Sequence, residues 1–238
     1  MNQRYLKDYL TTLILAVVLA LLVRQFLLAA YKVPTGSMQP TLKPGDFIFS
    51  VKPAYGWRLP FSEQVLAPQL PERGDLIVFR YPDQPLISYV KRVVGLPGDK
   101  VEIRQGRLIV NDVPLKYDLV DRAEDNPNPS LFDVYREYDE EISHFVILEK
   151  NQNKGHFGPV VVPPSEVFVL GDNRDASDDS RYWGSIPLNQ IVGQASLIWL
   201  SLDFQKKWGG NRYPQVRWKR VFTTLHLLSY RVFVSLRS

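Results

Sequence analysis

Ser37 is the residue of this chain best placed to act as a nucleophile. It lies in the run Thr35-Gly36-Ser37-Met38, a few residues past a long apolar segment. A serine hydroxyl attacks poorly until a neighbouring base removes its proton. The three histidines, at positions 144, 156 and 226, lie in polar, Gly-bounded or tail segments with no acid-rich motif to orient an imidazole. A lysine is therefore the base to look for.

The best candidate for that lysine is Lys91, which lies in the run 87–94. Pro85 before this run and the Gly- and Pro-containing turn at 95–99 after it predict a β-strand between them. Alternation places Lys91 and Arg92 on opposite faces, and one of the two should meet a packed interior. If that residue is Lys91, desolvation lowers its pKa, and a shift from about 10.4 to about 8 costs roughly 3 kcal/mol. An amine with such a pKa can serve as a general base.

A third segment, residues 167–184, joins a β-rich run to a loop dense in carboxylates, hydroxyls and guanidinium groups. Such a loop can orient a base through a hydroxyl, for which Ser177 is the candidate. It can also tie itself down through pairs of Asp and Arg, which bind one another in a bidentate way. Asp179 and Arg181 are the candidates for that pairing.

In this order, the three segments resemble the type I signal peptidases, in which a serine and lysine dyad removes signal sequences from exported proteins. The resemblance covers the apolar span and serine segment through Asp46, the run 73–79, the lysine segment 89–99 and the loop 171–184. It implies that Ser37 is the nucleophile and Lys91 the general base. The oxyanion hole would comprise the Ser37 N–H and the hydroxyl of Thr35, where some members of the family have serine.

The resemblance also assigns roles to the loop. Ser177 would hydrogen-bond the lysine amine and orient it. The remaining residues would hold the loop in place: Asp172, Asn173, Arg174, Asp179 and Arg181.

The expected reaction is cleavage of signal-peptide-bearing pre-proteins at Ala-x-Ala sites through an acyl-enzyme, with no cofactor and no metal. Composition agrees with this class. The chain has 238 residues, no cysteine and a net charge of only +4, with scattered basic residues, so no nucleic-acid partner is expected. Small side chains one and three residues before the cut are the preference that the family resemblance implies.

Residues 10–31 carry the targeting information, as an apolar stretch interrupted at Arg24 and Gln25. About 20 apolar residues cross a bilayer, so we interpret the stretch as a retained transmembrane helix rather than a cleaved signal peptide. Arg4 and Lys7 precede it, which favours a cytoplasmic N-terminus. We therefore expect a single-pass protein of the cytoplasmic (inner) membrane, with the lipid bilayer as a partner and the catalytic domain on the extracytoplasmic side.

Many short β-rich runs separated by Gly and Pro predict a mainly β fold: an antiparallel β-sheet catalytic core with an inserted β-rich cap, after one transmembrane helix. Gln105-Gly106 marks the tightest hairpin. The expected domains are an anchor at 1–31, a core at 32–110 and 165–205, a cap at 111–164 and a basic tail at 206–238. The predicted strands are 47–51, 76–80, 89–94, 100–104, 107–110, 145–149, 160–162, 167–170 and 191–200.

Several alternatives stay open. The aromatic segment 53–61 either rests at the membrane interface or is a packed loop, and the basic segment 216–238 either lies on the membrane or is appended to the core. A self-cleaving Ser/Lys protease of the repressor type has a similar core but carries a DNA-binding helix pair in place of an apolar span. A non-enzymatic, membrane-tethered β module is the other alternative. The S-x-x-K at 88–91 does not indicate a penicillin-binding enzyme, because a strand puts those two residues on opposite faces.

Overall fold

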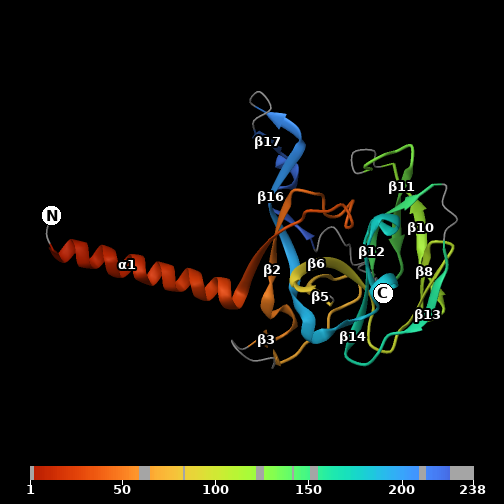
Figure 1. Cartoon of the computed structure of the whole chain (residues 1–238), viewed down its shortest axis with the longest axis horizontal. Helices are drawn as coiled ribbons and strands as arrows, with labels where there is room; N and C mark the ends of the chain where they lie inside the picture. Colours follow the sequence, from red (N-terminus) through yellow and green to blue (C-terminus); the bar gives the residue numbers. More distant parts are fainter. Residues whose placement is uncertain are drawn as a thin grey trace, which may run out of the picture.

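The structure is a computed structural model. It describes residues 3–58, 65–82, 84–121, 126–140, 142–150, 155–208 and 213–225. A long N-terminal helix projects from a body made of β-strands (Figure 1). The predicted fold class, mainly antiparallel β after an apolar N-terminal helix, is confirmed.

The apolar N-terminal segment forms α1 (Gln3–Leu22), which continues as a π-helical turn, η1 (Val23–Leu27). The stretch Lys7–Leu27 has a mean hydropathy of 2.3 and is not buried against the body, so it is long and apolar enough to cross a bilayer. The helix ends earlier than the sequence predicted. Leu28–Lys32 forms strand β1, because its backbone pairs with strand β2 (Asp46–Val51).

Lys52 fixes the end of the helix to the β body. Its Nζ donates hydrogen bonds of 2.9 Å to the carbonyl oxygens of Arg24 and Gln25. The last carbonyls of a helix have no partner within the helix, so a lysine placed there satisfies groups that would otherwise need water. The helix therefore joins the β body at a defined point.

The largest sheet among the described residues has nine strands and contains the lysine segment, while the serine segment lies in the turn between β1 and β2. Its central path runs β1, β2, β16 (Ile191–Trp208), β5 (Leu76–Tyr81), β6 (Gln84–Gly95), β14 (Glu166–Leu170) and β15 (Ile186–Pro187), with β17 (Tyr213–Val216) and β18 (Thr223–Thr224) also on β16. All of these pairings are antiparallel. Strand β6 lies between β5 and β14, so the lysine segment is near the middle of the sheet.

Residues 111–164, predicted to form a cap and called the cap below, contain a separate three-stranded sheet. Its strands are β10 (Lys116–Leu119), β11 (Phe132–Tyr138) and β12 (Ser143–Glu149). A further sheet is formed by β13 (Phe157–Val161), β7 (Lys100–Arg104), β8 (Arg107–Val110) and β9 (Val113–Pro114). Both lie on the β14 side of the body (Figure 1). A two-stranded sheet, β3 (Trp57–Arg58) with β4 (Val65–Leu66), completes the described strands.

Each predicted strand is present, although several are longer than the sequence indicated. The hairpin between β7 and β8 turns at Gln105 and Gly106, whose φ angles of 52° and 74° are those that a type I′ turn needs. Sequence reasoning missed β1, because it was assigned to the membrane span. It also missed β10 and β11, since their polar side chains hide the alternation of a half-buried strand.

Two of the open alternatives are decided for the described residues. Tyr55 packs against a buried cluster and donates a hydrogen bond of 2.9 Å to Asp75 Oδ2, so this part of the aromatic segment is a packed loop. The second alternative is decided for residues 216–225 of the basic segment. This part is appended to the core, since β18 pairs with β16 and Leu225 is buried. Residues 59–61 and 226–238 lie outside the described residues.

Candidate active site

The serine lies in a turn that two buried apolar side chains hold in place. Met38 and Leu42 are 2% and 0% exposed, and the Leu42 N–H donates to the Met38 carbonyl at 2.8 Å. At the base of the turn, the Gly45 N–H donates to the Val33 carbonyl at 2.9 Å. The loop is thus closed at its ends and anchored by its own apolar side chains, which presents Ser37 from a rigid support.

Lys91 reaches this serine from the neighbouring strand β6. Its Nζ lies 2.7 Å from Ser37 Oγ, although 54 residues separate the two along the chain. The lysine is 3% exposed. Burial lowers its pKa to about 8, against the opposing charges of Asp179 and Asp178. The serine therefore faces an amine that is half neutral near pH 8 and, in its neutral form, able to accept a proton.

Thr35 is close to the same serine. Its Oγ1 lies 3.4 Å from Ser37 Oγ, at the long end of hydrogen-bond distance. The threonine hydroxyl thus lies beside the atom that would attack, on the exposed side of the loop. The site therefore has a polar donor within reach of a carbonyl bound at Ser37.

The loop after β14 packs directly against the serine turn. The Asn173 N–H donates to the Ser37 carbonyl at 3.1 Å, and Asn173 Nδ2 donates to the Gly36 carbonyl at 3.2 Å. Gly171 lies so close that a Cβ added there would come within 2.5 Å of the Ser37 carbonyl oxygen and 2.2 Å of Ser177 Oγ. The position of the serine therefore depends on the position of residues 171–173.

Asp179 and Arg181 organise the far end of that loop. Arg181 Nε lies 2.7 Å from Asp179 Oδ1, and Asp179 Oδ2 accepts a hydrogen bond of 3.0 Å from the Gly171 N–H. Asp179 also caps the short helix α2 (Ser180–Trp183) by accepting from the Arg181 N–H. This single buried carboxylate therefore ties the two ends of the loop together.

Both cations of strand β6 are buried, where the sequence predicted that one of them would be. Arg92 is 0% exposed and lies on the face opposite Lys91. It forms a bidentate pair with Asp172, with both N–O distances 2.7 Å, and donates to the Gly74 carbonyl at 2.7 Å. The loop that carries Asp172 covers this face, and strand alternation alone could not reveal that covering.

The hydrogen bond expected from Ser177 to the lysine is not formed. Ser177 Oγ is buried and has no hydrogen-bond partner among the described residues, while the Lys91 amine bonds Ser37. The hydroxyl points at the Gly171 backbone, as the 2.2 Å approach to an added Cβ shows. A role for Ser177 in orienting the lysine is thus a prediction about the enzyme with substrate bound.

A cleft of about 290 Å³ opens over Ser37 and Lys91. Its lining comes from residues 31–35 on one side, residues 87–91 of β6 on the other, and Met38, Ala176 and Asp178. A larger hollow of about 580 Å³, beside Tyr55 and Pro187, contains neither residue of the dyad. The smaller cleft is therefore the one in which chemistry at Ser37 would occur.

Comparison with known proteins agrees with this geometry. Residues 6–200 match the model of the family described as signal peptidase, peptidase S26. The chain belongs to this family. It is 39% identical to the signal peptidase I of Pseudomonas aeruginosa, over 77% of this chain and 68% of that protein. It is also 33% identical to the signal peptidase I of Haemophilus influenzae, over 92% of this chain and 75% of that protein.

As a member of the signal peptidase family, the chain is a serine peptidase, and helix α1 fits a membrane-anchored protein. Within the described residues, no group of three or more His, Cys, Asp or Glu side chains could hold a metal ion. The residues that the structure gathers at Ser37 are a buried amine, a hydroxyl and backbone N–H groups.

Sequence reasoning missed the buried acid Glu137, and with it the surroundings of His144. Glu137 of β11 is 0% exposed and lies 3.1 Å from His144 Nε2. The acid that faces this histidine comes from another strand, so the segment around His144 in the sequence could not show it. The two residues lie on neighbouring strands of the cap and are paired in register. Nothing in the sequence marks position 137, because its neighbours along β11 are mostly polar or half-buried.

Proposed function

We propose that the chain removes signal peptides from exported precursors, with Ser37 as nucleophile and Lys91 as general base. One observation carries this proposal: the 2.7 Å distance between Ser37 Oγ and an amine whose pKa burial lowers to about 8. A lysine at its ordinary pKa would be protonated and unable to take a proton. Family membership supports precursors with signal peptides as the substrates.

In the acylation step, neutral Lys91 accepts the Ser37 proton as Oγ attacks the scissile carbonyl carbon. The carbonyl oxygen becomes an oxyanion, which the Ser37 N–H and the Thr35 hydroxyl stabilise by donating to it. When the C–N bond breaks, the ammonium of Lys91 returns its proton to the leaving amine. This leaves the signal peptide esterified to Ser37 and releases the mature protein with a free N-terminus.

Deacylation reverses the roles with water in place of the amine. Neutral Lys91 takes a proton from a water molecule as the water oxygen attacks the carbonyl carbon of the ester. The ammonium of Lys91 then protonates Ser37 Oγ as the acyl group leaves. We assign to Ser177 the orientation of the amine during these steps. Asp172, Asn173, Arg174, Asp179 and Arg181 hold the loop against the serine.

The cleft suits an extended peptide. In the part of the chain that the structure describes, β6 pairs with β14 only from Arg92 onward, so the edge of residues 87–91 that faces away from β5 lines the cleft without a strand partner. An extended substrate can hydrogen-bond such an edge, and alternate side chains then point into the cleft. The cleft is small, which favours small side chains before the cut, as in an Ala-x-Ala site.

The apolar N-terminal helix supports a site close to the membrane. The serine turn begins directly after β1, which follows η1 at the end of the apolar stretch. We propose a single-pass protein of the cytoplasmic membrane, with its catalytic domain on the extracytoplasmic side near the bilayer surface. Signal sequences lie in the bilayer there, so the enzyme need not extract them from lipid.

The test is cleavage of a precursor with an Ala-x-Ala site by the full chain, purified in detergent. The parent should cut once, after the second Ala, and Ser37→Ala and Lys91→Ala should each lower the rate by about a thousandfold or more. Ser196→Ala, on β16, and Lys100→Ala, an exposed lysine paired with Asp112, are the matched controls and should retain the parental rate.

Full activity in Ser37→Ala would contradict the proposal. So would a folded parent that leaves the precursor intact. Cleavage within the chain itself, with the precursor untouched, would favour a self-cleaving protease of the repressor type.

A further inference from the structure

We propose that Glu137 of the cap is a positioning residue for the peptidase reaction. It holds Arg174, and through Arg174 it holds the loop that supports the Ser37 carbonyl. The inference rests on the proposed function, but it concerns a residue that lies outside the dyad, the oxyanion hole and the loop itself.

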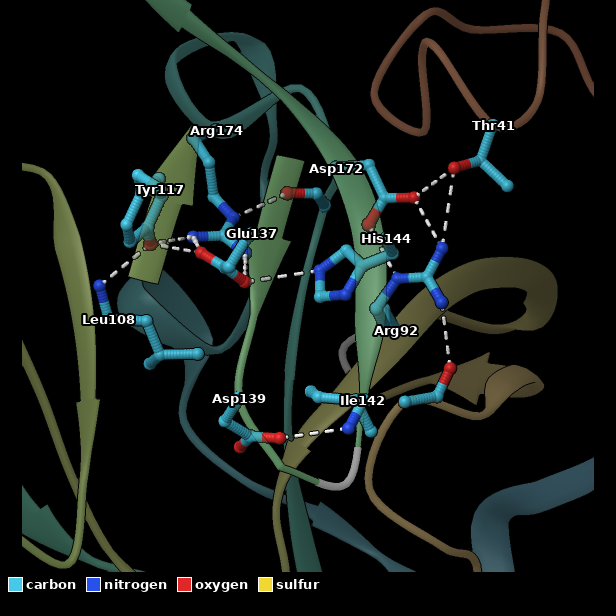
Figure 2. A network of polar contacts seen from close by, with 12 residues as sticks. Thr41, Arg92, Leu108, Tyr117, Glu137, Asp139, Ile142, His144, Asp172 and Arg174 are labelled. Carbon is cyan, nitrogen blue, oxygen red and sulfur yellow. Dashed lines mark hydrogen bonds and ion pairs between the residues drawn. The ribbon is translucent and has the colours of Figure 1, made fainter. Parts of the chain in front are cut away.

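Both carboxylate oxygens of Glu137 have partners. Its two carboxylate oxygens accept from the two terminal nitrogens of Arg174, at 2.7 and 2.5 Å. The Tyr117 hydroxyl donates to Oε2, and His144 Nε2 lies 3.1 Å from Oε1 (Figure 2). Glu137 and Arg174 are 0% and 3% exposed, so the pair is desolvated. The arrangement fixes the guanidinium plane of Arg174.

Arg174 is connected to the serine through the backbone of the loop. Arg174 Nε donates to the Gly171 carbonyl at 3.2 Å, and the Arg174 carbonyl accepts from Arg181 Nη2 at 2.5 Å. Gly171 packs against the Ser37 carbonyl, and Asn173 donates to it. Arg174 thus connects the two ends of the loop, and a rotation of its guanidinium moves the residues that contact Ser37.

The cap is also attached to the loop by bonds that do not involve the side chain of Glu137. Strand β12 already joins the cap to the loop through its backbone, because the Ile147 N–H donates to the Asp172 carbonyl at 2.8 Å. The Glu149 N–H donates to Asp175 Oδ2 at 2.7 Å. These bonds do not involve the Glu137 side chain. A variant that lacks its charge keeps the cap in contact with the loop but loses the orientation of Arg174.

Burying the Glu137–Arg174 ion pair carries a cost in desolvation. A buried ion pair is often no more stabilising than an apolar pair of the same volume, since both ions must leave water. Burying Glu137 and Arg174 is therefore a poor way to stabilise the cap and a good way to fix one geometry. His144 lies between Glu137 and the Asp172–Arg92 pair, so the packing links the cap to Asp172 of the loop as well as to Arg174 (Figure 2).

The experiment compares Glu137→Gln with Asp133→Asn in the full chain. Asp133 lies on the same strand and pairs with Lys150 at 3.3 Å, but both side chains are partly exposed. We expect Glu137→Gln to lower kcat by about tenfold to a hundredfold with KM within about twofold, because misplacing the reacting groups by about 1 Å has an effect of this size. Asp133→Asn should keep the parental kcat.

Two readouts separate positioning from general stability. Amide hydrogen exchange of peptides that cover 171–181 should accelerate in Glu137→Gln, while peptides from β5 and β16 keep their parental rates. In addition, the double variant Glu137→Gln/Arg174→Gln should lose no more activity than the worse single variant, since both residues act through one contact. If Glu137→Gln fails to fold, Arg174→Lys replaces it, because a lysine keeps the buried charge paired but lacks the Nε donor to Gly171.

The outcomes distinguish this proposal from the proposed function. A parental kcat in Glu137→Gln, with Ser37→Ala inactive, would overturn the positioning role and leave the peptidase intact. Unchanged exchange across 171–181 would overturn it whether or not the precursor is cut. An inactive parent would contradict the proposed function instead, and exchange would still decide whether Glu137 holds the loop.

Discussion

Lys91 and Arg92 are neighbours on one strand and both are buried, but Arg92 has many polar partners and the Lys91 amine has few. Arg92 has a carboxylate, a carbonyl and a hydroxyl as partners, all within 3.3 Å. The Lys91 amine has the Ser37 hydroxyl, and the carboxylates that act on it do so from a distance. The difference shows how one strand can carry a fixed structural charge on one face and a reactive base on the other.

The contrast has a thermodynamic consequence. Burial penalises a charge that has few partners, so Lys91 gives up its proton more easily, whereas the buried charge of Arg92 is compensated by the Asp172 carboxylate. Removing the lysine amine should therefore raise the free energy of unfolding, and removing the arginine side chain should lower it. Substitutions on the two faces test this difference in sign.

The largest effect is expected for Lys91→Met, which keeps the volume but removes the amine. Cleavage of the precursor should fall by about a thousandfold or more. The unfolded amine titrates at 10.5 and the folded one at about 8, so below pH 8 the folded chain carries a charge that it disfavours. The variant should thus be more stable than the parent by about 3 kcal/mol at pH 7.

This gain should shrink as the pH rises from about 8 towards 10.5, where both states lose the proton. Urea unfolding of the two proteins at pH 7 and pH 10 measures it. Equal stability of parent and variant at pH 7 would show that the amine is not desolvated as the structure indicates.

The opposite sign is expected for Arg92→Met. The substitution leaves Asp172 buried without its partner, and breaking such a pair costs about 3 to 5 kcal/mol. Urea unfolding at pH 7 gives the value, with Lys100→Met as the control, because its pair with Asp112 is exposed and contributes little. If Arg92→Met is as stable as the parent, the two faces of β6 do not differ in the way that the contacts indicate.

The same comparison shows how far the sequence could go. Alternating apolar residues and turn signals were enough to find β5, β6, β14 and β16, and the types and order of Ser37 and Lys91 were enough to propose the dyad. These features depend on local sequence. The period of a strand is visible in a few residues, and a serine that lacks a histidine partner directs attention to a lysine.

What the sequence could not show depends on contacts between distant segments. Arg92 is buried because Asp172, 80 residues later, covers its face. Glu137 is buried because Arg174, 37 residues later, reaches into the cap. Strand β11 was missed for the same reason, since a buried carboxylate in a strand looks like a solvated one until its partner is known.

A smaller effect of mixed sign is expected for Ser177→Ala. Ser177 is 7% exposed, and its buried hydroxyl has no hydrogen-bond partner among the described residues; an unsatisfied buried hydroxyl costs roughly 1 kcal/mol or more. The variant should therefore be as stable as the parent or slightly more stable. If the hydroxyl orients the amine when substrate is bound, kcat should still fall by about tenfold.

Measuring kcat and the urea midpoint on the same preparation separates the two contributions. Ser180→Ala is the matched control, because the Ser180 hydroxyl accepts from the Val169 N–H at 3.0 Å and its loss should lower stability. A parental kcat in Ser177→Ala would remove this serine from the reaction.

The smallest effect is expected for Asp178→Asn, in the lining of the cleft. Burial lowers the pKa of Lys91, and the negative charges of Asp179 and Asp178 oppose that lowering. Because the base acts when it is neutral, kcat/KM of the parent should rise with pH through a midpoint near 8. Removing one opposing charge should move this midpoint down by roughly 0.3 pH unit, with a smaller shift at high salt, because Asp178 is exposed and screened.

Asp112→Asn, whose carboxylate pairs with Lys100, should leave the midpoint in place. A midpoint that stays fixed or rises in Asp178→Asn would mean that burial alone sets the basicity of Lys91, and that the carboxylates of this loop serve only to hold it.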